Sequence, residues 1–191
     1  MKSSRHRSVG HQLRVLYQDV PASLLQSVEP RRRLTPEESA ENFRFVNDDT
    51  QDEAYEPAEL MHRVRRGVKP MATFLLKKQK QCYLSARSVR GATRAFGLEY
   101  RLFYLRGGWQ EAVVFQTGAK LADFYDPCEV IARYREAGVE LDQALFEAPL
   151  DSLARPLLFD DIVSHLRLPV KGLCLGYPIA ETISLIARTR E

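Results

Sequence analysis

Three arginines at helical spacing are the residues of this chain best suited to chemistry. Arg87, Arg90 and Arg94 follow one another at intervals of three and four, which places them on one face of a helix. Guanidinium groups bind carboxylates and phosphates through paired hydrogen bonds. Further cations stand on either side of them in the chain, at Lys77, Lys78, Lys80 and Arg106. We predict that these residues form a basic surface that binds an acidic protein or another anionic ligand.

Nucleic acid is the alternative partner for such a surface. Tyr83 and Trp109 are near in sequence, and aromatic rings among cations can stack on single-stranded bases. No RRM, KH or zinc-finger pattern accompanies them. A third interpretation assigns the arginines to a solvated helix face, or to a surface neutralised by the acidic segment 35–59 of the same chain.

The distribution of charge directs attention to the same region. The 191 residues carry a formal net charge of only +3, but the charges are segregated into blocks. Residues 35–59 hold nine acids and one arginine, whereas residues 60–106 hold twelve Lys or Arg and a single acid, Glu99. Blocks of this kind create local fields that the net charge does not report.

An enzyme or metal-handling protein that uses cysteine and histidine is the hypothesis from a different class. No Cys or His pair has C-x-x-C or H-x-x-x-H spacing, so a metal site would have to be assembled by the fold from His62, Cys82, Cys128, His165 and Cys174. Cys174 lies in an apolar segment, which is typical of an inert core thiol. We therefore expect no catalytic residue, no bound metal and no cofactor.

Cysteine usage and hydropathy also indicate a compartment. Three widely spaced cysteines suit a reducing environment better than a disulfide framework. The sequence has neither an apolar run long enough to span a membrane nor the apolar core of a signal peptide. These features predict a cytoplasmic protein that does not associate with membranes; they carry no signal for its oligomeric state.

The chain divides into two parts at the level of sequence. Residues 1–57 are read as a charged N-terminal extension, partly disordered or docking on the rest. Within it, Thr35-Pro36-Glu37-Glu38 has the pattern of a capping box that opens a short helix. Residues 58–191 are read as one compact α/β or α+β domain with a small mixed sheet and helices mainly on one face.

Periodicity and turn residues predict the elements that would position the arginines. We expect helices over 58–66, 83–96, 127–137 and 157–167, and a strand over 71–76. In the 83–96 helix, the buried face would carry Ser85, Val89, Ala92 and Phe96. Strands 98–105 and 110–115 should form a hairpin with a two-residue Gly107-Gly108 turn, which would pair Tyr100 with Phe115 and Leu102 with Val113. Asp160-Asp161 would begin the 157–167 helix.

The C-terminal segment is predicted to close the domain. Lys171 to Leu175 reads as a buried strand that turns at Gly176-Tyr177-Pro178 into a helix with Ile179, Ile183 and Ile186 on its buried side. The N–H groups at that helix start could bind an anion, but Pro178 removes one donor and no phosphate-loop residues follow. The turn is therefore interpreted as structural.

Several strings resemble an uncharacterised bacterial family known as domain of unknown function 3793, over about residues 60–186. The resemblance rests on Gly67-Val-Lys-Pro70 before Phe74-Leu75, the Arg-Gly-Gly hairpin turn, Lys120-Leu121, and Gly172-Leu-Cys-Leu-Gly-Tyr-Pro178. The resemblance implies a fold and no activity. This chain has Leu60-Met61 where the family carries a His-Cys pair, and it lacks the Cys-bearing tail of the family, so any metal or redox role of those residues does not carry over.

Overall fold

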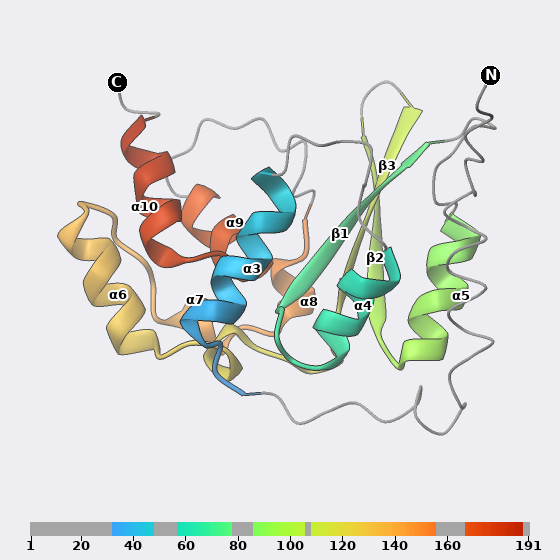
Figure 1. The fold of residues 1–191 in the computed structure, drawn as a ribbon, viewed down its shortest axis with the longest axis horizontal. Coiled ribbons are helices and arrows are strands. Elements are labelled where there is room, and N and C mark those ends of the chain that lie inside the picture. The colour runs from blue at the N-terminus through green and yellow to red at the C-terminus, as the bar shows by residue number, and fades with distance from the viewer. Residues whose placement is uncertain (1–31, 48–56, 78–85, 106–107, 156–166, 189–191) are drawn as a thin grey trace, which may run out of the picture.

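The computed structural model describes residues 32–47, 57–77, 86–105, 108–155 and 167–188, which form an α+β fold (Figure 1). Three strands and a set of mostly short helices make up this part of the chain. In chain order these elements are α3 (Pro36–Asn47), α4 (Pro57–Arg65), β1 (Met71–Lys77), α5 (Ala86–Phe96), β2 (Glu99–Tyr104), β3 (Trp109–Phe115), η3 (Leu121–Asp123), α6 (Pro127–Glu136), α7 (Ala144–Glu147), α8 (Leu150–Leu153), α9 (Arg167–Leu175) and α10 (Ile179–Arg188).

The sheet has the order β1-β3-β2, and both pairs are antiparallel. Central strand β3 is buried on both faces. Val113 and Phe115 face one hydrophobic core, whereas Ala112 and Val114 face a second one. The mixed sheet expected from the sequence is therefore a purely antiparallel sheet in the described part of the chain.

Helices cover both faces of the sheet, whereas the sequence suggested helices mainly on one face. On one side, α4 and α5 pack over the strands through Met61, Val64, Val89 and Phe96. On the other side, α6 to α10 contribute the larger core, which includes Tyr134, Phe146 and Leu173. Figure 1 shows α5 and α4 on the opposite side of the strands from α6 and α10.

The predicted hairpin is present, but its register was predicted wrongly by one residue. Tyr100 lies opposite Val114 and Leu102 opposite Ala112. Leu105 N–H donates to the Trp109 carbonyl at 2.9 Å, so the loop comprises residues 106–108, and Gly108 has a φ of 78°. A three-residue loop with glycine in the left-handed region replaces the two-residue turn. The shift of one residue turns Tyr100 and Leu102 toward α5.

The strand predicted at 171–175 is also wrong, because these residues end helix α9. Gly176 has a φ of 75°, its N–H donates to Leu173, and the Tyr177 N–H donates to Gly172. This pair of bonds is the Schellman motif that ends many helices at a glycine. Gly-Tyr-Pro is thus a helix-to-helix turn. The helix that follows, α10, was predicted correctly, with Ile186 buried and Ile179 and Ile183 packed on the core.

Helix α3 packs on the same core as α9 and α10, although the sequence placed it before a boundary at residue 58. Its capping box is present: Thr35 N–H donates to the Glu38 carboxylate at 3.0 Å, and Glu38 N–H donates to Thr35 Oγ1 at 3.3 Å. Phe43 meets Tyr177 edge to face with ring centroids 5.3 Å apart. Residues of this segment therefore pack on the larger core.

Four other predicted elements are found at their expected places. These are α4 followed by Gly67, β1, α5 followed by Gly97, and α6 followed by Gly138, each of the three glycines having a positive φ. The remaining predictions lie outside the described residues: the extension before residue 32, residues 83–85 at the start of the α5 helix, and the helix over 157–167 with Asp160-Asp161, except that Arg167 begins α9.

Candidate functional site

Arg87, Arg90 and Arg94 lie together on the exposed face of α5, as the sequence predicted. Val89, Ala92 and Phe96 alternate with them and are fully buried, so packing fixes which side of the helix faces outward. Gly97 ends the helix with a Schellman motif, and β2 begins two residues later. We call these three residues the arginine face.

No member of the arginine face has an ion pair with a described residue. By contrast, a carboxylate lies beside each of Arg32, Arg33, Arg101, Arg133 and Arg135. Arg101, for example, donates to Asp151 through two bonds of 2.5 and 2.6 Å. Helix α5 contains no acid of its own. Among the described residues, therefore, no carboxylate occupies these cations.

The described acids of the 35–59 segment do not neutralise the arginine face. Glu38 pairs with Arg32, and Glu41 pairs with Arg63 at 3.0 Å. Helix α3 also lies on the far side of β1 from α5 (Figure 1). Lys77 ends β1, whereas Lys78, Lys80, Arg106 and Tyr83 lie outside the described residues.

Tyr104 is a further surface residue that sequence reasoning missed. It is 79% exposed and lies on the same side of β2 as Tyr100 and Leu102, which pack toward α5. Strand β2 runs back along α5 after the Gly97 turn. Residues 99–104 span about 17 Å of strand and residues 87–96 about 14 Å of helix, so Tyr104 lies level with the Arg87 end. Tyr104 follows Tyr100 and Leu102 at every second position of an aromatic-rich strand. This spacing could have placed it on the same side of the strand from the sequence alone.

A second group of cations is buried where α3, α4 and α9 meet. Arg63 is 6% exposed and donates from Nε to Asn42 Oδ1 at 3.0 Å. Asn42 is fully buried and donates in turn to the carbonyls of Val68, at 2.9 Å, and Gly176, at 3.2 Å. Together with Lys69, Asn42 and Arg63 form what we call the buried cation cluster. It satisfies the backbone of two segments that are far apart in the chain.

Lys69 places an amino group in the interior of the protein. Its Nζ donates to the Leu175 carbonyl at 2.6 Å and lies 5.5 Å from the centroid of the Tyr177 ring. Burial, and secondly the charge of Arg63, lower the pKa of Lys69 to about 7. The segment from Gly67 to Pro70 thus lies against the segment from Gly172 to Pro178.

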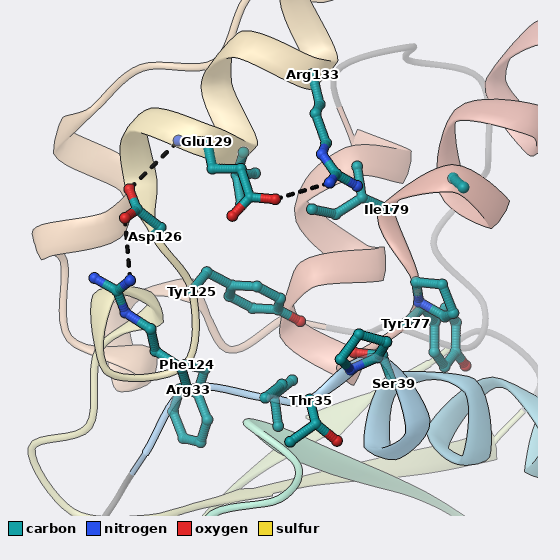
Figure 2. A pocket seen from close by; sticks show the side chains of 15 residues that line it. Arg33, Thr35, Ser39, Phe124, Tyr125, Asp126, Glu129, Arg133, Tyr177 and Ile179 are labelled. Carbon is teal, nitrogen blue, oxygen red and sulfur yellow. Dashed lines mark hydrogen bonds and ion pairs between the residues drawn. The ribbon is translucent and has the colours of Figure 1, made fainter.

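A pocket of about 320 Å³ lies where α3, α6 and α10 begin. Figure 2 shows Arg33 and Arg133 on different sides of it, with Tyr125 between them. The Arg33–Asp126 pair measures 3.1 Å and the Arg133–Glu129 pair 2.9 Å. We call this the helix-start pocket; its other walls are Leu34, Thr35, Pro36, Ser39, Phe124, Val130, Tyr177, Pro178, Ile179 and Ala180.

The cysteines and histidines do not assemble into a reactive or metal-binding group within the described part of the chain. Burial raises the pKa of Cys174 to about 12, which suppresses its thiolate. Cys128 is exposed at the start of α6, and the His62 ring packs edge to face on Phe96 at 4.9 Å. Cys82 and His165 lie outside the described residues.

In the part of the chain that the structure describes, no helix is long and apolar enough to cross a membrane. The comparisons with known proteins add no relative: no family model matches the chain, and neither the curated proteins nor the solved structures contain a match.

Proposed function

We propose that this protein is a non-enzymatic cytoplasmic binding module that uses the arginine face of α5 to recognise an acidic segment of a partner protein. The observation that carries the proposal is that none of Arg87, Arg90 and Arg94 has a carboxylate partner among the described residues, whereas several other exposed arginines have one. Paired guanidinium–carboxylate bonds would supply both attraction and orientation.

The spacing of the arginines favours a partner with acids at matching intervals. At about 1.5 Å rise per residue, the three side chains are distributed over about 10 Å of one helix face. A second helix with acidic residues three and four positions apart has the same repeat. Tyr104 at one end would add apolar contact area, since tyrosine is enriched at interfaces.

Binding of a fluorescein-labelled oligo-glutamate peptide, followed by fluorescence polarisation, tests the proposal. We expect the triple variant R87Q/R90Q/R94Q to lose about tenfold in affinity at low salt, because each exposed contact contributes up to about 1 kcal/mol. The control is R101Q/R135Q, which removes exposed arginines that already have carboxylate partners and lie outside the helix-start pocket, and it should leave the affinity unchanged.

The same titration with single- and double-stranded DNA and RNA separates the two partner classes. Tighter binding of an oligonucleotide than of the peptide, lost in the triple variant and falling steeply between about 50 and 200 mM salt, would replace the acidic-protein proposal with the nucleic-acid alternative. Equal losses in the triple variant and the control would contradict a role for α5 in either.

A further inference from the structure

The three helices that begin at the helix-start pocket differ in whether a side chain caps their first N–H groups. Helices α3 and α6 are capped by their own side chains, since Thr35 and Glu38 cap α3 and Asp126 accepts the N–H groups of Cys128 and Glu129. Helix α10 follows Pro178, and the N–H groups of Ile179 and Ala180 have no side-chain acceptor among the described residues. These donors line the pocket wall.

The side chain of Ser39 is a second observation that favours a ligand in the same pocket. Ser39 lines the pocket from α3 and is only 8% exposed. Its N–H donates to the Thr35 carbonyl at 3.0 Å, but its hydroxyl makes no hydrogen bond to a described residue. The hydroxyl is therefore available to donate to an acceptor atom in the pocket. Figure 2 shows Ser39 and Thr35 on the α3 side of the pocket.

We propose that the helix-start pocket binds a small organic carboxylate, with its oxygens on the first turn of α10 and on Ser39. A volume of about 320 Å³ is at the small end of the range for ligand pockets. Arg133 has exposed donors beyond those used by Glu129 and lies at the mouth. The site is separate from the arginine face, and binding there does not depend on the function proposed above.

The surroundings favour a monoanion with an apolar body over a phosphate. Leu34, Phe124, Val130 and Ile179 provide apolar wall on which a short aliphatic or aromatic chain would lie. Asp126 and Glu129 contribute negative charge beside the two arginines, which disfavours a dianion. The hydrogen bond from the Glu129 N–H makes the largest contribution to the lowered pKa of Asp126, so this carboxylate remains charged.

Amide chemical-shift mapping of the full chain by NMR tests the proposal, with hexanoate and phenylacetate as probes. We expect both acids to shift the amide resonances of Ile179 and Ala180 in a saturable manner. Hexanamide and phenylacetamide, which lack the charge, should shift them much less. Inorganic phosphate, which lacks the apolar body, should also bind more weakly.

Two variants assign the effect to the site. Ser39→Ala removes the hydroxyl from a helix position that tolerates alanine, and Arg133→Gln removes a surface cation paired only within α6. Each should weaken hexanoate binding about threefold to tenfold, whereas Arg135→Gln, on α6 but outside the pocket lining, should not change it. Equal shifts with the amides, an equal response to phosphate, no saturation, or binding insensitive to both variants would overturn the proposal.

Discussion

The arginine face and the buried cation cluster place the same chemical groups in opposite environments. On α5, three guanidinium groups face solvent and no described carboxylate pairs with them. At the junction of α3, α4 and α9, Arg63 and Lys69 are enclosed and donate to carbonyl or amide oxygens of the protein itself. The donors of the cluster hold the fold together, whereas those of α5 have no carboxylate partner among the described residues. The two uses are distinguished by how exposed each cation is and by whether it has a hydrogen-bond partner within the described part of the chain, because the residue types are similar in both places.

The strongest test of this comparison is Asn42→Ala in the buried cation cluster. The substitution removes the donor to Val68 and Gly176 and the acceptor for Arg63 Nε. Each buried polar group left without a partner costs about 1 to 3 kcal/mol, so we expect the free energy of unfolding to fall by about 3 to 5 kcal/mol. Urea unfolding followed by circular dichroism measures it. Gln143→Ala, at an exposed position, is the control, and a loss as small as that of the control would show that the cluster is not structural.

A pair of glycine substitutions isolates the contact between the cluster and the Gly-Tyr-Pro turn. Gly176 and Gly118 both have positive φ, of 75° and 66°. A Cβ at Gly176 would lie 2.5 Å from Asn42 Nδ2 and 3.0 Å from Pro70 Cδ, whereas one at Gly118 meets nothing within 4 Å. Gly118→Ala should cost about 1 kcal/mol for the backbone alone, and Gly176→Ala about 2 to 4 kcal/mol. Equal losses of unfolding free energy would mean that the turn relaxes away from Asn42.

The pH dependence of stability reports on Lys69. Its pKa is about 7 in the folded protein, and the ordinary value of 10.5 applies when the chain unfolds. Between these values the unfolded chain holds a proton that the folded protein lacks, so the contribution of Lys69 to stability increases as the pH rises. We expect the wild type to gain about 2 kcal/mol relative to Lys69→Met between pH 7 and pH 9.

The comparison with Lys69→Met is needed because other buried groups act in the opposite direction. Burial raises the pKa of both Cys174 and Tyr134 to about 12, so these groups lower the stability once the unfolded chain begins to lose their protons, above about pH 9. Parallel stability curves for the wild type and the variant would show that Lys69 keeps its charge in the interior.

The smallest effect is expected on the arginine face. Arg87 with Arg90 and Arg90 with Arg94 are like-charged neighbours one turn apart, and each such pair destabilises a helix by about 0.2 to 0.5 kcal/mol. We therefore expect R87Q/R90Q/R94Q to be slightly more stable than the wild type in urea unfolding at low salt. Added salt should remove the difference. A loss of more than about 1 kcal/mol would reveal a structural role for these arginines.

The parts of the fold that the sequence predicted well are those with local signals. The buried stripe of α5, the capping box at Thr35 and the glycines after α4, α5 and α6 each depend on residues within a few positions of one another. The segment from Lys171 to Leu175 failed because five apolar-rich residues before a glycine fit a buried strand and the end of a helix equally well. Packing on α10 decides in favour of the helix. A Cβ at Gly172 would overlap Thr182, so the two helices approach closely only because of this glycine.

Only the part of the candidate site whose residues are close together in the sequence could be predicted. The arginine face follows from spacing within one helix. The buried cation cluster and the helix-start pocket combine residues from distant segments, such as Arg33 with Asp126 and Lys69 with Leu175. The capping box at Thr35 and the helix start at residue 127 were predicted separately, but the sequence contains nothing that brings them together.

The hydrogen bonds of Asn42 to Gly176 and of Lys69 to Leu175 also have a consequence for folding kinetics. They join residues that are 134 and 106 positions apart, so they belong to the contacts of highest sequence separation. Such contacts form late in a folding reaction, because a long loop must close first. Once formed, they link α3 and α4 to α9 and α10, so the C-terminal helix pair cannot detach without breaking them. Amide hydrogen exchange should therefore find α3, α9 and α10 opening as one cooperative unit.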